Sequence, residues 1–400
     1  MVKPITAMTH DTDIPQGYKA TALGVIPQKW EVKFLGDLLS RCTNGLTYDV
    51  SITCGIPVTR IETISTGEIN YAKVGYIPNE SGYETFRMQK GDILYSHINS
   101  LSQIGKVAYY KGDKEIYHGM NLLLLRANES LDKQYLYYTL LTDHMRHMAQ
   151  VIAKPAVNQA SISTGDLKRV KIAVPPLAEQ RKIAEVLGVW DEAIEKQARL
   201  IEKLALRKRA LMQRLLSAKL RLPGFSEPWK KVKLGDVAEL YQPQTIQSED
   251  LSQTGYPVYG ANGLIGYYNN YNHEYPQVVI TCRGSSCGTV NFTPGKCWIT
   301  GNAMVLNVDN NRDVNKSFFY YLISNSSFVN LISGSGQPQI VRQPLLKFEL
   351  RIPPLKEQTA IAEVLTAADR EIDLAKEKLE RLRRQKRGLM QQLLTGKKRI

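Results

Sequence analysis

The sequence predicts an α+β protein in which two globular units alternate with two long helices. The first observation is a repeat: residues 175–222 and 353–400 align without a gap at an offset of 178, and 23 of the 48 positions are identical. Both copies begin with Pro-Pro-Leu-x-Glu-Gln and contain no later proline, as a long helix requires. The second observation is that short apolar runs and turn-rich segments fill the sequence before each copy, which is typical of strands joined by loops.

A second, weaker repeat gives the order of the domains. Trp30 and Trp229 each precede a Leu-Gly-Asp segment, at an offset of 199. Outside such flanks the two units share little sequence, which predicts one fold adapted to two different targets. The predicted parts are a mobile polar tail (1–16), a first unit (17–174), a first helix (175–222), a second unit (223–352) and a second helix (353–400).

Within the units, apolar runs and helical spacing predict the individual elements. The predicted strands are residues 91–95, 106–110, 122–125, 276–281 and 304–308, and the predicted helices are residues 132–150 and 315–324.

Each long helix carries apolar residues at alternating steps of three and four, which is the a/d seam of a coiled coil. The seam residues are Ile183, Leu187, Trp190, Ile194, Ile201, Leu204, Leu211 and Leu215 in the first helix, and Ile361, Leu365, Ile372, Leu379, Leu382, Leu389 and Leu393 in the second. Lys208 and Lys386 interrupt the seam at equivalent points, and a polar seam residue can fix the register of a pair.

The connections favour an antiparallel pair formed within the chain, with one unit at each end, because a parallel pair would require the second unit to span the whole helix backwards. The segment before Trp30 is then expected near the end of the second helix, in a nearly circular arrangement with a pseudo-two-fold axis.

The net charge of +14 favours a polyanionic partner, nucleic acid above all. Each long helix contributes +5, which leaves +4 for the remainder of the chain. Two other interpretations of the helix charge stay open: a solvated face, and the attraction of an acidic protein.

The sequence lacks the usual signatures of catalysis, so neither catalytic residues nor metal ligands are expected. It contains no GxxxxGK[ST], GxSxG or HExxH motif, and its Pro-Pro pairs lack the residues of an adenine methyltransferase motif. Five cysteines without a CxxC pair predict free thiols in a cytoplasmic protein. His144 and His147 lie three residues apart but are expected to be solvated. No apolar run is long enough to span a membrane.

Two turn-rich segments, each just before a Gly-x-Val strand start, could place polar side chains on DNA bases and phosphates. The candidate DNA-binding residues are Ser96, His97, Asn99, Ser102, Gln103 and Lys106 in the first unit, and Tyr259, Asn262, Arg283, Ser285 and Ser286 in the second. Arg283 suits guanine and Asn262 suits adenine. The alternative is that both segments are ordinary surface loops.

The chain resembles the DNA-specificity subunit of Type I restriction–modification enzymes. The matching motifs are Gly-x-Ile-Pro-x-x-Trp at residues 24–30, the Leu-Gly-Asp that follows it, Gly-Asp-Ile-Leu at residues 91–94, and the two Pro-Pro-Leu-x-Glu-Gln helix starts. The segment that precedes the second unit, residues 224–229, departs from the Gly-x-Ile-Pro-x-x-Trp pattern of residues 24–30. The resemblance implies that the units are two target-recognition domains, each reading one half of a bipartite site, and that the helices set the spacer between the halves.

The resemblance also implies partners for the chain, which itself would hold no cofactor. These are double-stranded DNA, two methyltransferase subunits that use S-adenosylmethionine to methylate adenine N6, and two motor-nuclease subunits that use ATP and Mg²⁺. Three alternatives remain: a coiled-coil adaptor with two protein-binding heads, an enzyme with an unrecognised motif, and the specificity subunit of a methylation-only system.

Overall fold

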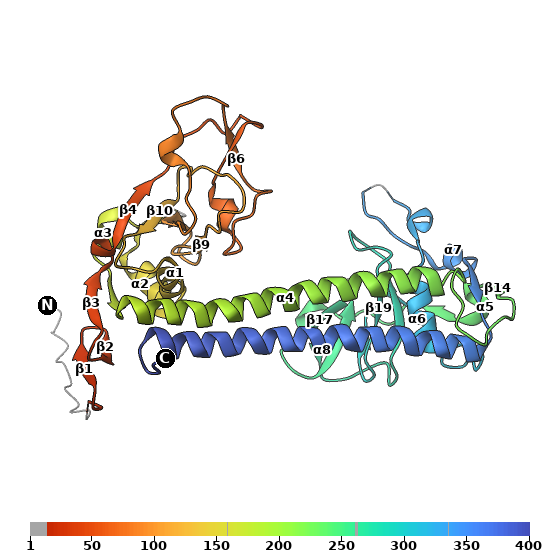
Figure 1. The fold of residues 1–400 in the computed structure, drawn as a ribbon. Helices are drawn as coiled ribbons and strands as arrows, with labels where there is room; N and C mark the ends of the chain where they lie inside the picture. The colour runs from red at the N-terminus through yellow and green to blue at the C-terminus, as the bar shows by residue number, and fades with distance from the viewer. Residues whose placement is uncertain (1–13, 158, 261–262, 335) are drawn as a thin grey trace. The chain divides into compact units, whose positions relative to one another are not determined.

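The computed structural model describes residues 14–400, except 158, 261, 262 and 335 (Figure 1). The chain divides into two compact units: unit 1 comprises residues 1–196 and 380–400, and unit 2 comprises residues 197–379. Each unit contains one globular part and one end of each long helix. The globular parts, residues 17–174 and 223–352, are called the first head and the second head below.

Two long helices, α4 and α8, dominate the helical structure. The helices are α1 (Lys133–Leu140), α2 (Asp143–Ile152), α3 (Thr164–Lys168), α4 (Leu177–Leu215), α5 (Leu234–Val237), α6 (Lys316–Ser324), α7 (Arg342–Leu346) and α8 (Leu355–Leu394). Within the described part of the chain, none of them is both long and apolar enough to cross a membrane.

The strands lie in the two heads. In the first head they are β1 (Tyr18–Thr21), β2 (Gly24–Pro27), β3 (Glu31–Phe34), β4 (Leu39–Asn44), β5 (Ile56–Val58), β6 (Gly75–Ile77), β7 (Ile93–Tyr95), β8 (Ile98–Asn99), β9 (Val107–Tyr109), β10 (Leu123–Ala127), β11 (Lys154–Ala156), β12 (Gln159–Ser161) and β13 (Lys171–Val174). In the second head they are β14 (Lys230–Lys233), β15 (Glu239–Tyr241), β16 (Tyr256–Gly260), β17 (Gly263–Tyr268), β18 (Val278–Thr281), β19 (Val290–Phe292), β20 (Trp298–Ile299), β21 (Ala303–Asn307) and β22 (Glu349–Ile352).

Each head contains its own four-stranded antiparallel sheet, and the two sheets have the same topology. The strand order is β4-β10-β7-β9 in the first head and β15-β21-β18-β19 in the second. The central pairs also correspond, since Leu124 pairs with Leu94 in the first sheet and Val305 with Val279 in the second. In each head the entering strand pairs with the leaving strand, β3 with β13 and β14 with β22. The predicted α+β class and the predicted common fold are confirmed.

One predicted element is wrong. Residues 132–150 form two helices, α1 and α2, instead of a single helix. Thr142 adopts an extended conformation between them, and its side chain accepts a hydrogen bond from the Met145 amide, which caps α2. A threonine that caps a new helix start in this way offers the backbone an alternative to continuing the helix.

The core of each unit runs from the sheet to the long helices. In unit 1, Trp30 and Tyr135 belong to one buried cluster with Ile183 and Leu187 of α4 and Leu393 of α8. In unit 2, Phe318 shares a cluster with residues from both long helices, among them Leu215, Ile361 and Leu365. Each head is therefore seated on the helix pair by apolar packing, which is the main stabilising term in such an interface.

The predicted pairing of the long helices is confirmed, and it is antiparallel. In unit 1, Lys386 near the end of α8 meets Asp191 near the start of α4. In unit 2, Leu204 packs with Ile372, and the Gln197 side chain donates to a backbone carbonyl of α8 at 2.9 Å. All the seam residues named above are buried or half-buried.

The glutamine of the Pro-Pro-Leu-x-Glu-Gln motif joins each long helix to its head. Gln180 Oε1 accepts from the Asp132 amide at 2.7 Å, and its Nε2 donates to the Pro175 carbonyl at 2.9 Å. Gln358 makes the matching bond to the Asn315 amide, at 2.9 Å. Asp132 and Asn315 cap α1 and α6, so each glutamine fixes the start of a head helix against the start of a long helix.

The segment that enters the first head also reaches the end of α8, as the connections predict. The Tyr18 hydroxyl donates to the Gly396 carbonyl at 3.0 Å. Gly396 has φ +70°, and a Cβ there would lie 2.3 Å from Pro27. A glycine is therefore needed where the chain turns beneath the entering strands.

Candidate nucleic-acid interface

The two loops that hold most of the candidate DNA-binding residues occupy the same place in the two heads. One joins β7 to β9 and the other joins β18 to β19, which are corresponding edge connections of the two sheets. The Gly105 amide donates to the Ser96 carbonyl at 2.8 Å, and the Gly288 amide donates to the Thr281 carbonyl at 2.9 Å. Both glycines have positive φ, +79° and +90°. Both loops are thus closed by the same backbone hydrogen bond from a glycine, although they differ in length and composition.

In the first loop, the predicted residues divide into buried and accessible ones. Ser96 and His97 are 1% and 6% exposed, so they support the loop from beneath. Burial lowers the pKa of His97 to about 4. Its ring Nδ1 is buried without a hydrogen-bond partner among the described residues. Neither side chain is therefore available at the surface of the loop.

The remaining candidates of the first loop are accessible at least in part. Ser102 is exposed, while Asn99, Gln103 and Lys106 are half-buried. Asn99 Nδ2 donates to Ser96 Oγ at 3.2 Å, which holds the amide against the loop. Lys106 Nζ donates to the Ser65 carbonyl at 2.7 Å, so this charge also ties the loop to the neighbouring segment.

In the second head, Arg283 and Ser285 are exposed and Ser286 is half-buried. Tyr259 lies on a different sheet, on β16, where it packs partly buried against the cluster around Cys297 and Ile299. Burial raises the pKa of Tyr259. The structure therefore groups the arginine and the serines in one loop and leaves the tyrosine on a separate strand. Asn262 lies outside the described residues.

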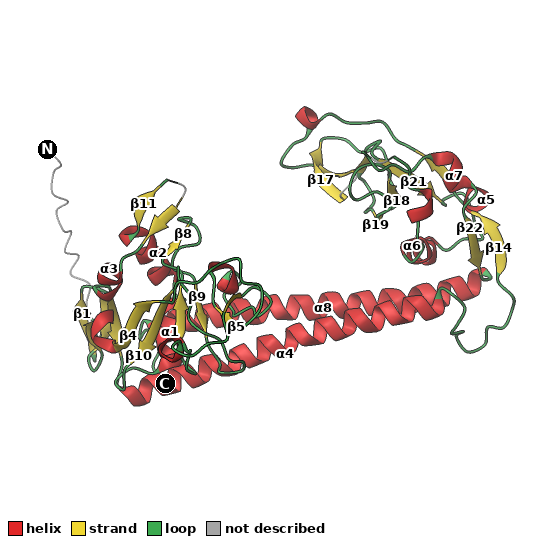
Figure 2. Ribbon diagram, turned by 90° about the horizontal axis from the view of Figure 1, so that it is seen from above, coloured by secondary structure: helices red, strands yellow, loops and turns green. Residues whose placement is uncertain are grey.

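A further segment, missed by the sequence reasoning, packs on each loop. In the first head it is the hairpin β11–β12, which pairs through β12 with β8 and so extends the loop into a three-stranded sheet (Figure 2). The Ile162 amide donates to the His97 carbonyl at 2.8 Å. Val157, near the tip, is 92% exposed. A single exposed apolar side chain is ordinary on a protein surface, so Val157 alone does not mark a contact surface.

The second head repeats this contact. The Ile340 amide donates to the Cys282 carbonyl at 2.9 Å, and the Gly284 amide donates to the Pro338 carbonyl at 3.0 Å. A bridge also joins Arg283 to Gln339. Residues 336–339, which a bridge between Gln339 and Ser333 closes into a hairpin, are therefore the counterpart of the hairpin β11–β12, and each head presents a loop and a hairpin together.

The sequence does contain a pattern that identifies these hairpins. Gln159-x-x-Ile162 and Gln337-x-x-Ile340 are related by 178, the same offset as the long helices. The repeat therefore begins before the helices, inside the heads, where the amides of Ile162 and Ile340 dock the two hairpins.

The cysteines and histidines form no metal site within the described residues. The five cysteines are free thiols, as the sequence predicts. Burial raises the pKa of Cys282 to about 11, which keeps this thiol protonated at neutral pH. His144 and His147 are exposed on α2.

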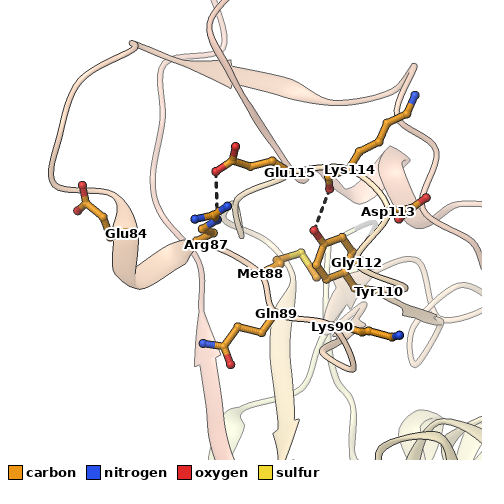
Figure 3. A pocket seen from close by; sticks show the side chains of 10 residues that line it. All are labelled: Glu84, Arg87, Met88, Gln89, Lys90, Tyr110, Gly112, Asp113, Lys114 and Glu115. Atoms are coloured by element: carbon orange, nitrogen blue, oxygen red, sulfur yellow. Dashed lines mark hydrogen bonds and ion pairs between the residues drawn. The ribbon is translucent and has the colours of Figure 1, made fainter.

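A surface hollow of about 530 Å³ lies in the first head, and none of the candidate DNA-binding residues lines it (Figure 3). Charged side chains of both signs line it, and two of them, Arg87 and Glu115, form an ion pair at 3.0 Å. The Tyr110 hydroxyl donates to the Lys114 carbonyl at 2.8 Å across its wall.

Comparison with known families gives a match over most of the chain. The model of the Type I restriction modification DNA specificity domain matches residues 27–205 and again residues 226–384. The two matches cover the two heads and most of both long helices.

Individual proteins show the same similarity. A putative Type I restriction enzyme MjaX specificity subunit from Methanocaldococcus jannaschii is 34% identical over 415 aligned positions, covering 96% of this chain and 97% of the relative. The MjaVIII specificity subunit of the same organism is 23% identical, with 94% of each chain covered. The crystal structure of a Type I restriction–modification S subunit from M. genitalium superposes with a TM-score of 0.58 at 19% identity, covering 91% of this chain and 96% of that one. The likeness to the solved structure supports the fold.

Proposed function

Because the chain belongs to the family of Type I restriction–modification DNA-specificity subunits, we propose that its two heads read the two halves of a split DNA target. Subunits of this family recognise the target sequence and are not themselves catalytic. Family membership removes the interpretation of the chain as a protein adaptor, and it agrees with the lack of catalytic motifs in the sequence.

The observation that carries the proposal is the equivalence of the two loop-and-hairpin pairs. The same closing bonds hold both loops, and the same isoleucine bond docks both hairpins. The accessible side chains differ, however: the first loop offers Ser102 and Gln103, whereas the second offers Arg283 and Ser285. One scaffold with two sets of polar side chains is suited to reading two unrelated short sequences, because base edges in the major groove are distinguished by their donors and acceptors.

The chemistry directed by this recognition belongs to partner subunits. We propose that two methyltransferase subunits with S-adenosylmethionine methylate adenine N6, one adenine in each half. The adenine must leave the duplex for this reaction, since its amino group is engaged in base pairing. In a restriction complex, two motor-nuclease subunits would supply ATP- and Mg²⁺-dependent cleavage. The presence of a motor-nuclease subunit distinguishes a restriction system from a methylation-only system.

The long helices have two proposed roles. Each spans about 40 residues and carries a net +5 over its repeat, which suits contact with phosphates or with an acidic surface of a methyltransferase. The length of the pair would also set the number of base pairs between the two half-sites.

The test is a methylation map. The chain is expressed together with its methyltransferase partner, in a host that lacks adenine methylation, and N6-methyladenine is located across the genome by long-read sequencing. The expected result is a split motif with a constant gap and one methylated adenine in each half, on opposite strands. A contiguous motif, or methylation that persists when the specificity subunit is omitted, would overturn the proposal.

A further inference from the structure

We propose that two matching clusters, each made of a lysine, an aspartate and a tyrosine, fix the position of each head on the helix pair and thereby restrict the gap that the protein accepts in its target. The clusters are called clamps: the first is Tyr138, Asp191 and Lys386, and the second is Tyr321, Asp369 and Lys208. This inference rests on the proposed function, because the gap exists only if the two heads read two half-sites.

The first clamp joins three elements of unit 1. The Tyr138 hydroxyl of α1 donates to Asp191 Oδ2 of α4 at 2.7 Å, and Lys386 Nζ of α8 contacts Asp191 Oδ1 at 2.5 Å. The same ammonium lies 4.9 Å from the centroid of the Tyr138 ring, within cation–π range. The Lys386 side chain is only 12% exposed. A head helix and both long helices therefore converge on one carboxylate.

The second clamp repeats these contacts in unit 2 with the long helices exchanged. The Tyr321 hydroxyl of α6 donates to Asp369 Oδ2 of α8 at 2.7 Å, and Lys208 Nζ of α4 contacts Asp369 Oδ1 at 2.5 Å. The ammonium lies 5.3 Å from the centroid of the Tyr321 ring. The aspartates and the lysines are each related by the repeat offset of 178.

The clamps specify one register of the helix pair. In an antiparallel pair the numbers of facing residues have a nearly constant sum, and both clamps give 577 (208 + 369 and 191 + 386). A slip of one heptad keeps the apolar seam aligned but places Lys208 opposite Ala362 or Lys376. The same slip places Asp191 opposite a leucine in either direction. Every clamp charge would lose its partner, so the alternatives that the apolar seam permits are disfavoured.

The lysine in the seam of each helix is better explained by this selection against other registers than by a gain in stability. A partly buried ion pair adds little net stability, because desolvation offsets the attraction, and an apolar residue would fill the position at least as well. Polar groups in a coiled-coil seam are best attested as devices that fix register.

The tyrosines extend this control to the heads. In the first head, Gln180 holds the start of α1 and Asp191 holds Tyr138 near its end, so α1 is attached to α4 at two points that are 11 residues apart (191 − 180). The second head has the same two points, Gln358 and Asp369, also 11 residues apart (369 − 358). Two polar attachments along one helix prevent the head from pivoting about either of them.

The experiment measures methylation by the complete methyltransferase complex on a panel of duplexes. Each duplex carries the two mapped half-sites, with the native gap or with a gap one or two base pairs longer or shorter. The first variant is Tyr138→Phe with Tyr321→Phe, which removes only the two hydroxyls. Its matched control is Tyr137→Phe with Tyr320→Phe, on the same helices but outside the clamps. The second variant neutralises both clamps through Lys208→Met, Lys386→Met, Asp191→Asn and Asp369→Asn.

Clamp variants are expected to retain methylation at the native gap, while the ratio of altered-gap to native-gap methylation rises about tenfold, the scale of a lost coupling between contacting residues. The control variant keeps the wild-type ratio. An unchanged ratio in both clamp variants overturns the proposal, and so does an equal loss at every gap accompanied by a lower unfolding temperature, which would show a purely structural role. If the wild-type complex methylates no split duplex at all, it is the proposed function that fails.

Discussion

The glutamate of the Pro-Pro-Leu-x-Glu-Gln motif forms an ion pair with an arginine in both copies, and the two pairs differ in their exposure to solvent. Substituting each glutamate therefore tests how much each ion pair stabilises its head. Glu357 is 1% exposed; its two oxygens accept from the Arg221 guanidinium at 2.6 and 2.8 Å, and one also accepts from the Trp229 indole at 3.2 Å. Glu179 accepts the equivalent pair of bonds from Arg399, at 2.8 and 2.9 Å.

The solvent exposure of the two ion pairs determines how much stability each glutamate substitution is expected to cost. The Arg221 side chain is 26% exposed, whereas that of Arg399 is 42% exposed. Removing one partner of a buried pair strands the other charge, which costs about 3–5 kcal/mol. Glu357→Gln is therefore expected to destabilise the second head by about 3 kcal/mol, the lower end of that range, since Arg221 keeps some water. Glu179→Gln is expected to cost only about 1 kcal/mol, as Arg399 is readily solvated.

Native-state hydrogen exchange measures both effects in one chain. The amides of β14 and β22 report on the second head, and those of β3 and β13 report on the first and serve as the internal reference. In Glu357→Gln, exchange should accelerate in β14 and β22 alone. Equal acceleration for the two variants in their own heads, or a larger effect of Glu179→Gln, would refute the reasoning from burial.

Three other outcomes are expected. Inserting seven residues between positions 191 and 208 and seven between 369 and 386 should widen the gap by about three base pairs, because seven helical residues rise about 10 Å; an unchanged gap in the methylation map would argue against the helices as a spacer. Burial lowers the pKa of His97 and His118 to about 4, from 6.5 in the unfolded chain, so the unfolded state binds protons first and the first head loses stability as the pH falls from about 6.5 to 4. Urea unfolding should show a loss of about 2 kcal/mol per histidine at pH 5 relative to pH 7.5, and a pH-independent midpoint would contradict it. Finally, Arg283→Ala should weaken binding to the second half-site by about 1–3 kcal/mol if the guanidinium contacts a base, or lower the salt dependence by about one ion if it contacts a phosphate; binding as tight and as salt-dependent as that of the matched surface variant Arg351→Ala would remove Arg283 from the interface.

The fold was largely predictable because its main signal is a long repeat. Heptad spacing and the 178-residue offset suffice to predict two paired helices, and the connections suffice to predict that they run antiparallel. The equivalence of the β7–β9 and β18–β19 loops was predictable too, since a Gly-x-Val strand start follows each of them. The interruption at Thr142 was not, because a threonine is tolerated within a helix and its capping role appears only with the neighbouring backbone.

Individual site residues were harder to predict, because a loop sequence does not show which side chains point inward. Ser96 and His97 read as surface residues beside Asn99, but the sheet closes beneath them and buries both. The β11–β12 hairpin begins 48 residues after the end of the loop that it packs on (154 − 106), and the pairing of β12 with β8 brings them together.

The clamps show a similar limit. Lys208 and Lys386 stand out in sequence as interruptions of the seam, and a role in register follows from that alone. Their partners do not follow, since each lysine pairs with an aspartate 161 or 195 residues away in the chain. The tyrosines come from head helices whose packing against the long helices is a tertiary feature.

The division of recognition between two heads is tested most directly by exchanging one of them. Residues 30–174 are replaced by the corresponding segment of a relative with a different mapped target, and N6-methyladenine is mapped with the same methyltransferase partner. We expect one half of the split motif to change to that of the relative, while the other half and its methylated adenine stay the same. A change in both halves, or in neither, would contradict this division of recognition.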